Sequence, residues 1–89
     1  MATYELEFRP SAYREFARLD PAIKRRIAPA LDGLREDPRP HDAIHLSGAE
    51  DVWRIRIGAY RVVYAIEDDR LVVIVMRIGP RGSVYRRRG

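Results

Sequence analysis

The segment from residue 52 to residue 64 reads Val52-Trp53-Arg54-Ile55-Arg56-Ile57-Gly58-Ala59-Tyr60-Arg61-Val62-Val63-Tyr64. Polar and apolar side chains alternate on either side of Gly58-Ala59, which predicts two β-strands joined by a tight turn. A glycine at the first of two turn residues fits a type II′ turn. We therefore expect a hairpin in which Ile57 faces Tyr60 and Trp53 faces Tyr64.

The register of this hairpin places its arginines on one face. Arg56 faces Arg61, and Arg54 lies two residues along the same strand, about 7 Å away. Like charges directly opposite each other destabilise a hairpin, so three arginines with no acid beside them favour an anion-binding site. The alternative is an exposed sheet face that carries solvated charge. The other face, which we expect to pack against helices, carries Trp53, Ile55, Ile57, Tyr60, Val62 and Tyr64.

Apolar periodicity predicts a strand and two helices before the hairpin. The strand covers Tyr4–Phe8 and has one wet face. Ser11 is expected to cap the first helix, and Asp20-Pro21 to begin the second. Pro29 lies inside the second helix and predicts a kink there. The apolar positions of the helices are Ala12, Phe16, Leu19, Ile23, Ile27, Ala30, Leu31 and Leu34.

After the hairpin, Leu71–Ile78 predicts a last strand, joined to its predecessor by a two-residue turn at Asp68-Asp69. The fold class is therefore α+β in the order β-α-α-β-β-β, with an N-terminal strand, a two-helix hairpin and a three-stranded antiparallel meander. We expect an antiparallel sheet with both helices on one face. Residues 1–85 are expected to form a single domain, and residues 86–89 a flexible basic tail.

The face without helices also collects apolar side chains. They are Val63, Val72, Ile74 and Met76. An apolar patch beside a basic one favours a docking surface for a protein partner. Coverage of this patch by the tail or by a loop is the alternative.

The composition excludes several classes of function. There is no cysteine among the 89 residues, so disulfides, thiolate metal sites and a cysteine nucleophile are excluded. His41 and His45 lie in a loop segment, and we expect no metal site and no cofactor there. The longest apolar run, residues 71–76, is far shorter than the ~20 residues that span a membrane. No signal peptide is visible, so a cytoplasmic location without membrane contact is expected.

The charge is distributed unevenly along the chain. Residues 1–50 carry eight basic and nine acidic side chains, whereas residues 51–89 carry nine basic and four acidic ones. The basic character thus belongs to the C-terminal half. Such an asymmetry favours a polyanionic partner, and nucleic acid is the first candidate.

Several motifs resemble the RelE/ParE toxin superfamily, and its RelE-like branch in particular. They are Leu46-Ser47-Gly48, Val52-Trp53-Arg54-Ile55-Arg56-Ile57-Gly58, Tyr60-Arg61-Val62-Val63-Tyr64, Ile78-Gly79-Pro80-Arg81 and Val84-Tyr85. The resemblance spans nearly the whole chain. It implies the toxin of a type II toxin–antitoxin system, a metal-independent endoribonuclease that cleaves mRNA in the ribosomal A site and is inhibited by a cognate antitoxin. Operator DNA would be reached only through the antitoxin.

The resemblance also implies roles for five residues. Arg54 and Arg56 would bind RNA, while Arg61, Arg81 and Tyr85 would be catalytic. The family reaction is attack of a ribose 2′-hydroxyl on its own 3′-phosphate. Arg54, Arg56 and Arg61 would stabilise the charge on the phosphorane, Arg81 would assist the leaving oxygen, and Tyr85 would stack on or orient the base.

Two other functions are compatible with the sequence. A ParE-like toxin would poison DNA gyrase without any nuclease activity, and the segment around Arg81 lacks the histidine and charged residues usual in the RelE branch. A non-toxic remnant would bind its antitoxin and, through it, operator DNA.

Overall fold

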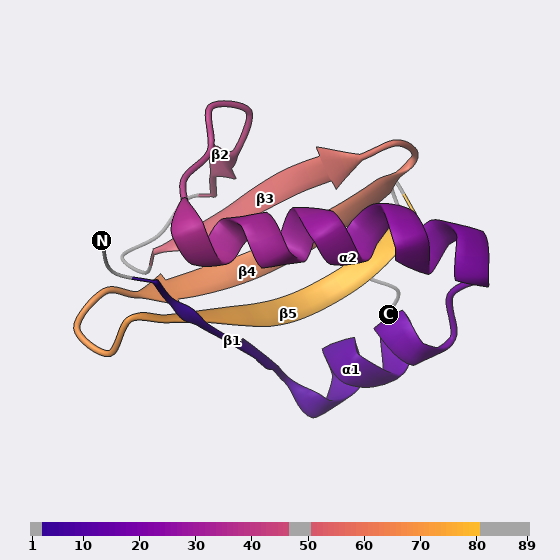
Figure 1. Ribbon diagram of the computed structural model, residues 1–89, viewed down its shortest axis with the longest axis horizontal. Helices are drawn as coiled ribbons and strands as arrows, with labels where there is room; N and C mark the ends of the chain where they lie inside the picture. The colour runs from indigo at the N-terminus through magenta and orange to yellow at the C-terminus, as the bar shows by residue number, and fades with distance from the viewer. Residues whose placement is uncertain (1–2, 47–50, 81–89) are drawn as a thin grey trace.

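The computed structural model describes residues 3–46 and 51–80, which form two helices and a five-stranded sheet. Helix α2 lies across one face of the sheet, and α1 lies beside the outer part of β5 (Figure 1). This arrangement confirms the α+β class. The elements are β1 (Glu5–Phe8), α1 (Pro10–Ala17), α2 (Pro21–Glu36), β2 (Ile44–His45), β3 (Val52–Ile57), β4 (Tyr60–Glu67) and β5 (Val72–Pro80), and the strand order is β1-β5-β4-β3-β2.

The β3–β4 hairpin has the predicted register. Trp53 pairs with Tyr64, Ile55 with Val62, Arg56 with Arg61 and Ile57 with Tyr60. Gly58 has φ of +61°, whereas Ala59 is not in the left-handed region, as a type II′ turn requires. The local sequence therefore sets which face each hairpin side chain occupies.

The sheet is mixed, so the prediction of an antiparallel sheet was wrong for its edge. β1 pairs in parallel with β5, with Glu5 opposite Val72 and Phe8 opposite Val75. The alternation in β1 assigns its side chains to two faces but carries no information on the direction of the neighbouring strand. The two helices after β1 provide the long connection that a parallel arrangement needs.

A fifth strand, β2, was not predicted. It pairs only Ile44 with Arg54 and His45 with Trp53, on the outer edge of β3. Two residues are too few to show a period of two, so the sequence alone gives no sign of this strand.

Proline, rather than serine, begins the first helix. α1 starts at Pro10, with Arg9 as the residue before it, so Ser11 lies inside the helix and the predicted cap there was wrong. A proline fits the first helical position because its fixed φ is helical and its missing N–H is not needed. α2 begins at Pro21 as predicted and continues through Pro29 to Glu36 as one helix.

The β4–β5 connection contains four residues instead of the predicted two. β4 extends to Glu67 and β5 begins at Val72, and Leu71 N–H donates to the carbonyl of Asp68 at 3.2 Å. Leu71 has φ of +56°, in the left-handed region. β5 continues to Pro80, with an irregularity in its pairing opposite Val63 and Tyr64.

The core lies between α2 and the sheet and includes the apolar side of α1. Tyr64 is fully buried, and Trp53 and Tyr60 pack against the same cluster, as predicted for that face of the hairpin. The buried members are Ala12, Ile27, Leu31, Leu34, Ile55, Val62, Tyr64, Ile66, Val73, Val75 and Ile78. Within the described ranges, no helix is long and apolar enough to cross a bilayer.

Candidate nucleic-acid interface

Three arginines lie together on the face of the sheet opposite α2. Arg56 and Arg61 are direct cross-strand partners. Arg54 lies two residues before Arg56 on β3, so its side chain is on the same face of the sheet. Arg61 is only 8% exposed, Arg54 is half-buried and Arg56 is exposed. We call Arg54, Arg56 and Arg61 the arginine row. The three guanidinium groups therefore range from solvent-exposed to nearly buried. This arrangement suits an anion that loses part of its hydration when it binds.

On the sheet face itself, the described residues that pair with the arginine row or flank it are not acidic. Across β4, Arg61 pairs with Gly79 of β5, and Val63 separates Arg54 from Arg77. Within the described part of the chain, these two rows of the sheet face carry neither a carboxylate nor a histidine. An arginine remains protonated, so the row can stabilise negative charge but cannot remove a proton.

Acidic side chains on the same face gather toward the β4–β5 turn. Glu5 and Glu7 lie on β1, and Glu67 ends β4. Arg70 bridges two of them, at 2.5 Å from Glu67 and 3.7 Å from Glu7. The face is therefore basic near the β3–β4 turn and largely neutralised at the other end.

Two of the five predicted site residues, Arg81 and Tyr85, lie outside the described residues, as does the predicted tail of residues 86–89. The described part of β5 ends at Pro80, which pairs with Tyr60, and Gly79 pairs with Arg61. The chain thus enters the segment that contains Arg81 and Tyr85 directly beside the arginine row.

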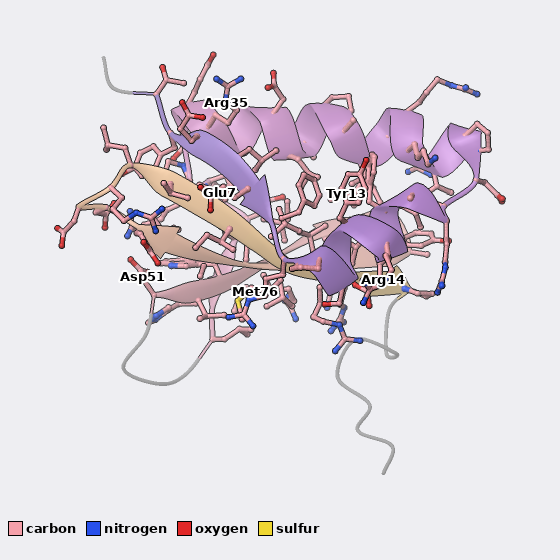
Figure 2. The ribbon with its side chains drawn as sticks, turned by 90° about the horizontal axis from the view of Figure 1, so that it is seen from below. Glu7, Tyr13, Arg14, Arg35, Asp51 and Met76 are labelled. Carbon is pink, nitrogen blue, oxygen red and sulfur yellow. The ribbon has the colours of Figure 1, made fainter. Side chains whose placement is uncertain are left out.

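The apolar patch predicted on this face is smaller than the sequence indicated. Val63 and Val72 are 8% and 4% exposed, whereas Ile74 and Met76 are half-buried. Figure 2 shows Met76 below the sheet, on the side away from α2. The exposed apolar surface of this face thus includes Ile74 and Met76, and also Ile44 of β2, which pairs with Arg54 and is 48% exposed.

The two histidines have separate surroundings. The ring of His45 lies 4.8 Å from that of Trp53, between centroids. His41 belongs to the turn before β2. Among the described residues, no three metal-ligating side chains come together.

A hollow of about 240 Å³ opens between α2 and the outer edge of β3, where β2 leaves the strand uncovered. Arg56 is one of the residues that line it, so the hollow adjoins the arginine row. Its lining is mainly apolar and consists of Ala30, Gly33, Leu34, Asp37, Pro40, Asp42, Ile55, Arg56 and Ile57.

A charged cluster that the sequence did not indicate lies at the opposite end of the molecule, around Arg39. Its guanidinium binds Asp51 and Asp68, at 2.8 Å for the latter, and lies 5.7 Å from the centre of the Trp53 ring. The Tyr4 hydroxyl donates to Asp68 at 2.6 Å, and the indole N–H of Trp53 donates to Asp51. This cluster, which we call the Arg39 clamp, connects the loop after α2 to β3 and to the β4–β5 turn.

Hydrogen bonding explains the perturbed pKa values in the clamp. The hydrogen bond from Arg39, and then that from Tyr4, lower the pKa of Asp68. The bond to Asp68 raises the pKa of Tyr4, and the bonds to Asp68 and Asp51 raise that of Arg39. Asp51 and Asp68 are far from Arg39 in sequence, so no local spacing could have predicted the cluster.

The buried Tyr64 is part of the core and not of the site. Burial raises the pKa of Tyr64. Its hydroxyl donates to the carbonyl of Pro38 at 2.8 Å. This bond holds the loop after α2 on the sheet.

Comparison with known proteins identifies the family of this chain. Residues 6–85 match the family of the ParE toxin of type II toxin–antitoxin systems, parDE. The mRNA interferase toxin RelE of Escherichia coli K12 is 31% identical over 80 residues, which cover 88% of this chain and 83% of that protein.

Solved structures show the same fold. The isolated E. coli RelE toxin superimposes with a TM-score of 0.79 at 30% identity, over 92% of this chain and 90% of that one. The archaeal RelE–RelB complex from Pyrococcus horikoshii contains a chain with a TM-score of 0.77 at 27% identity, and the match covers 91% of this chain and 98% of that one. The chain therefore belongs to the RelE/ParE superfamily and is a RelE-like toxin of a type II toxin–antitoxin system.

Proposed function

We propose that this toxin is a ribosome-dependent endoribonuclease that cleaves mRNA in the ribosomal A site. The observation that carries the proposal is the arginine row, in which Arg61 lies directly opposite Arg56 and is almost buried. Three guanidinium groups on one face of the sheet supply positive charge and several N–H donors, which is the chemistry that binds a phosphate group. A relative of this chain bears the name mRNA interferase toxin RelE.

In the proposed reaction, a ribose 2′-oxygen attacks the adjacent 3′-phosphorus and the bond from phosphorus to the 5′-oxygen breaks. The products are a cyclic 2′,3′-phosphate and a free 5′-hydroxyl. Arg54 and Arg56 bind the RNA, and with Arg61 they stabilise the extra negative charge of the phosphorane. The nucleophile belongs to the substrate, so no metal enters the step.

Proton transfer needs groups other than the arginine row. Arg81 is proposed to contact the phosphate and to assist the leaving 5′-oxygen, and Tyr85 to stack on or orient the base. Since arginines stay protonated, the 2′-hydroxyl proton goes to Tyr85 or to a group of the ribosome, and a proton from that group or from water completes the 5′-hydroxyl. This division of roles makes cleavage dependent on the assembled ribosomal site.

The proposed regulation is the binding of a cognate antitoxin, supported by the similarity to RelE in RelE–RelB complexes. An apolar and acidic antitoxin segment suits the face that holds Ile74, Met76 and the arginine row. Operator DNA would be bound through the antitoxin. The proposed place of action is the cytoplasm, where the ribosome is found.

The test is a cleavage assay on ribosomes stalled with a defined A-site codon, with mRNA ends mapped by primer extension. Wild type is compared with Arg81→Ala and Tyr85→Phe, with naked mRNA as a control and Arg35→Gln as a matched variant remote from the row. Cleavage in the A-site codon that both site variants weaken supports the proposal. Absence of cleavage by folded, ribosome-bound wild type contradicts it.

A second candidate is a ParE-like poison of DNA gyrase, which the match to the ParE toxin family favours. The absence of a carboxylate or histidine next to the arginine row, within the residues described, is compatible with a toxin that lacks nuclease activity. A gyrase supercoiling assay separates the two candidates. Inhibition of supercoiling without mRNA cleavage would establish the second.

A further inference from the structure

The last strand contains a β-bulge shortly before it reaches the arginine row. The core residues of β5 are Val73 and Val75 before the bulge and Ile78 after it, so their spacing changes from two residues to three. Val75 and Arg77 pair with consecutive residues of β4, which makes Met76 the extra residue. Bulges bend a strand, redirect its side chains and are frequent beside active sites.

The bulge decides which residues of β5 share a face with the arginine row. Gly79 is the cross-strand partner of Arg61 on the face opposite α2, whereas Pro80 pairs with Tyr60, which packs against the core. Without the extra residue these assignments would be reversed, because a shift of one residue moves every side chain of a strand to the other face. If the alternation continued, the next position, Arg81, would belong to the face of the arginine row.

The end of β5 has no strand on its outer side and is held by α1 instead. β1 ends opposite Val75. Beyond that point the Ile78 N–H is directed outward and donates to a carboxylate oxygen of Glu15 at 2.8 Å. The next outward position in the described part of β5 is Pro80, which has no N–H. Glu15 therefore binds the last outward N–H of the strand.

The same carboxylate also binds the residue that follows the bulge. Nε of Arg77 donates to the other oxygen of Glu15 at 3.2 Å. The Glu15 side chain is only 28% exposed, so water competes less for its oxygens than at an open surface. Hydrogen bonds to an ionised acceptor are stronger than those between neutral groups. One carboxylate of α1 thus fixes two consecutive residues directly after Met76.

We propose that Glu15 is a positioning residue for RNA cleavage, which holds the end of β5 so that Arg81 enters the site beside Arg61. The inference rests on the proposed function, since that function gives Arg81 its role at the phosphate. Glu15 acts through β5 and does not itself contact the RNA. A displacement of about 1 Å in a reacting group lowers a rate by up to ~100-fold. Binding of the RNA depends on the arginine row, so it should not change.

The test measures single-turnover cleavage on stalled ribosomes over a range of toxin concentrations. This design gives the rate at saturation and the concentration for half-maximal rate separately. Glu15→Ala removes both hydrogen bonds, whereas Glu15→Gln keeps an oxygen that can accept the Ile78 N–H. Arg77→Ala removes only the ion pair and is the milder variant. Leu71→Val is the matched control, because it strains a left-handed residue at the other end of β5 and leaves Glu15 in place.

We expect Glu15→Ala to lower the saturating rate by about 10- to 100-fold, with the half-maximal concentration unchanged. Glu15→Gln should recover most of the rate, Arg77→Ala should lose less of it, and Leu71→Val should keep the wild-type rate. Equal losses in Glu15→Ala and Leu71→Val would show that Glu15 acts only through stability. A wild-type rate in Glu15→Ala would show that it positions nothing. Either outcome overturns the proposal.

A second readout does not depend on cleavage. The NMR chemical shifts of the backbone amides of Arg81 and Tyr85 should move in Glu15→Ala, move less in Arg77→Ala and stay in place in Leu71→Val. Wild type that does not cleave mRNA would contradict the proposed nuclease. Amide shifts that stay in place in both Glu15→Ala and Arg77→Ala would overturn the positioning role, whether or not the wild type is active.

Discussion

The carboxylate of Glu15 on α1 accepts the backbone N–H of Ile78 on β5 at 2.8 Å. β1 ends opposite Val75, so beyond this point the edge of β5 is covered by a helix instead of a strand. The other oxygen of the same carboxylate accepts from Nε of Arg77 at 3.2 Å. Glu15 therefore fixes the part of β5 that leads into Gly79, the cross-strand partner of Arg61.

Replacing Glu15 should loosen the end of β5. We expect Glu15→Ala to lower the free energy of unfolding by about 1–3 kcal/mol, because the N–H of Ile78 loses a charged acceptor. Glu15→Gln keeps a carbonyl oxygen and should lose less than half as much. Urea denaturation measures both, and amide hydrogen exchange at Ile78 locates the change. Equal losses for the two variants would contradict this role of the carboxylate.

Arg61 should matter for cleavage and not for folding. In Arg61→Met the apolar stem is kept and the charge facing Arg56 is removed, so the free energy of unfolding should stay level or rise by up to ~1 kcal/mol. Loss of a group that stabilises the phosphorane should lower the cleavage rate on stalled ribosomes by about 100-fold or more. A sharply lower melting temperature would show that the charge of Arg61 is structural.

The Arg39 clamp should make stability sensitive to acid. The pKa of Asp68 in the folded state lies below its ordinary value of 3.8, so the ionised carboxylate favours the folded state. The stability that the ionised carboxylate contributes is fully present above pH 3.8. It is lost as the pH falls through the lowered pKa of the folded state. Wild type should thus be more stable than Asp68→Asn at about pH 6, and the two should converge at about pH 2. A difference that stays constant between these pH values would contradict the assignment.

Leu71 adopts a backbone conformation that suits other residues better. Its φ of +56° is tolerated by asparagine and is particularly unfavourable for β-branched side chains. We expect Leu71→Val to lower the free energy of unfolding by about 1–2 kcal/mol. Leu71→Asn relieves strain but loses partial burial, so it should stay within about 0.5 kcal/mol of wild type. Equal stability of the two variants, measured by thermal unfolding, would show that the turn relaxes.

Gly58 should be sensitive for two separable reasons. Gly58→Ala imposes a side chain at φ of +61° and brings a Cβ within 2.8 Å of Arg26, so it should cost about 1–3 kcal/mol. In an Arg26→Ala background the steric part disappears and the loss should be smaller. A double-mutant cycle by urea denaturation separates the two. Full additivity would mean that Arg26 moves away at no cost.

Local sequence determined the parts of this protein that depend on neighbouring residues. The alternation around Gly58-Ala59 predicted the hairpin register, because a side-chain period of two and a two-residue turn leave one pairing. That register placed Arg54, Arg56 and Arg61 on one face, as the structure confirms. The start of α2 at Pro21 followed in the same way from helix-terminus chemistry.

Contacts between distant segments were decided only by the tertiary structure. The parallel pairing of β1 with β5, the two-residue strand β2 and the Arg39 clamp each join residues whose separation in sequence carries no periodic signal. The same holds for the carboxylate of Glu15 on the edge of β5 and for the guanidinium of Arg26 on Gly58. The physical reason is that alternation and capping report the immediate chain environment, whereas which strand edge or carboxylate meets which partner depends on how the helices pack on the sheet.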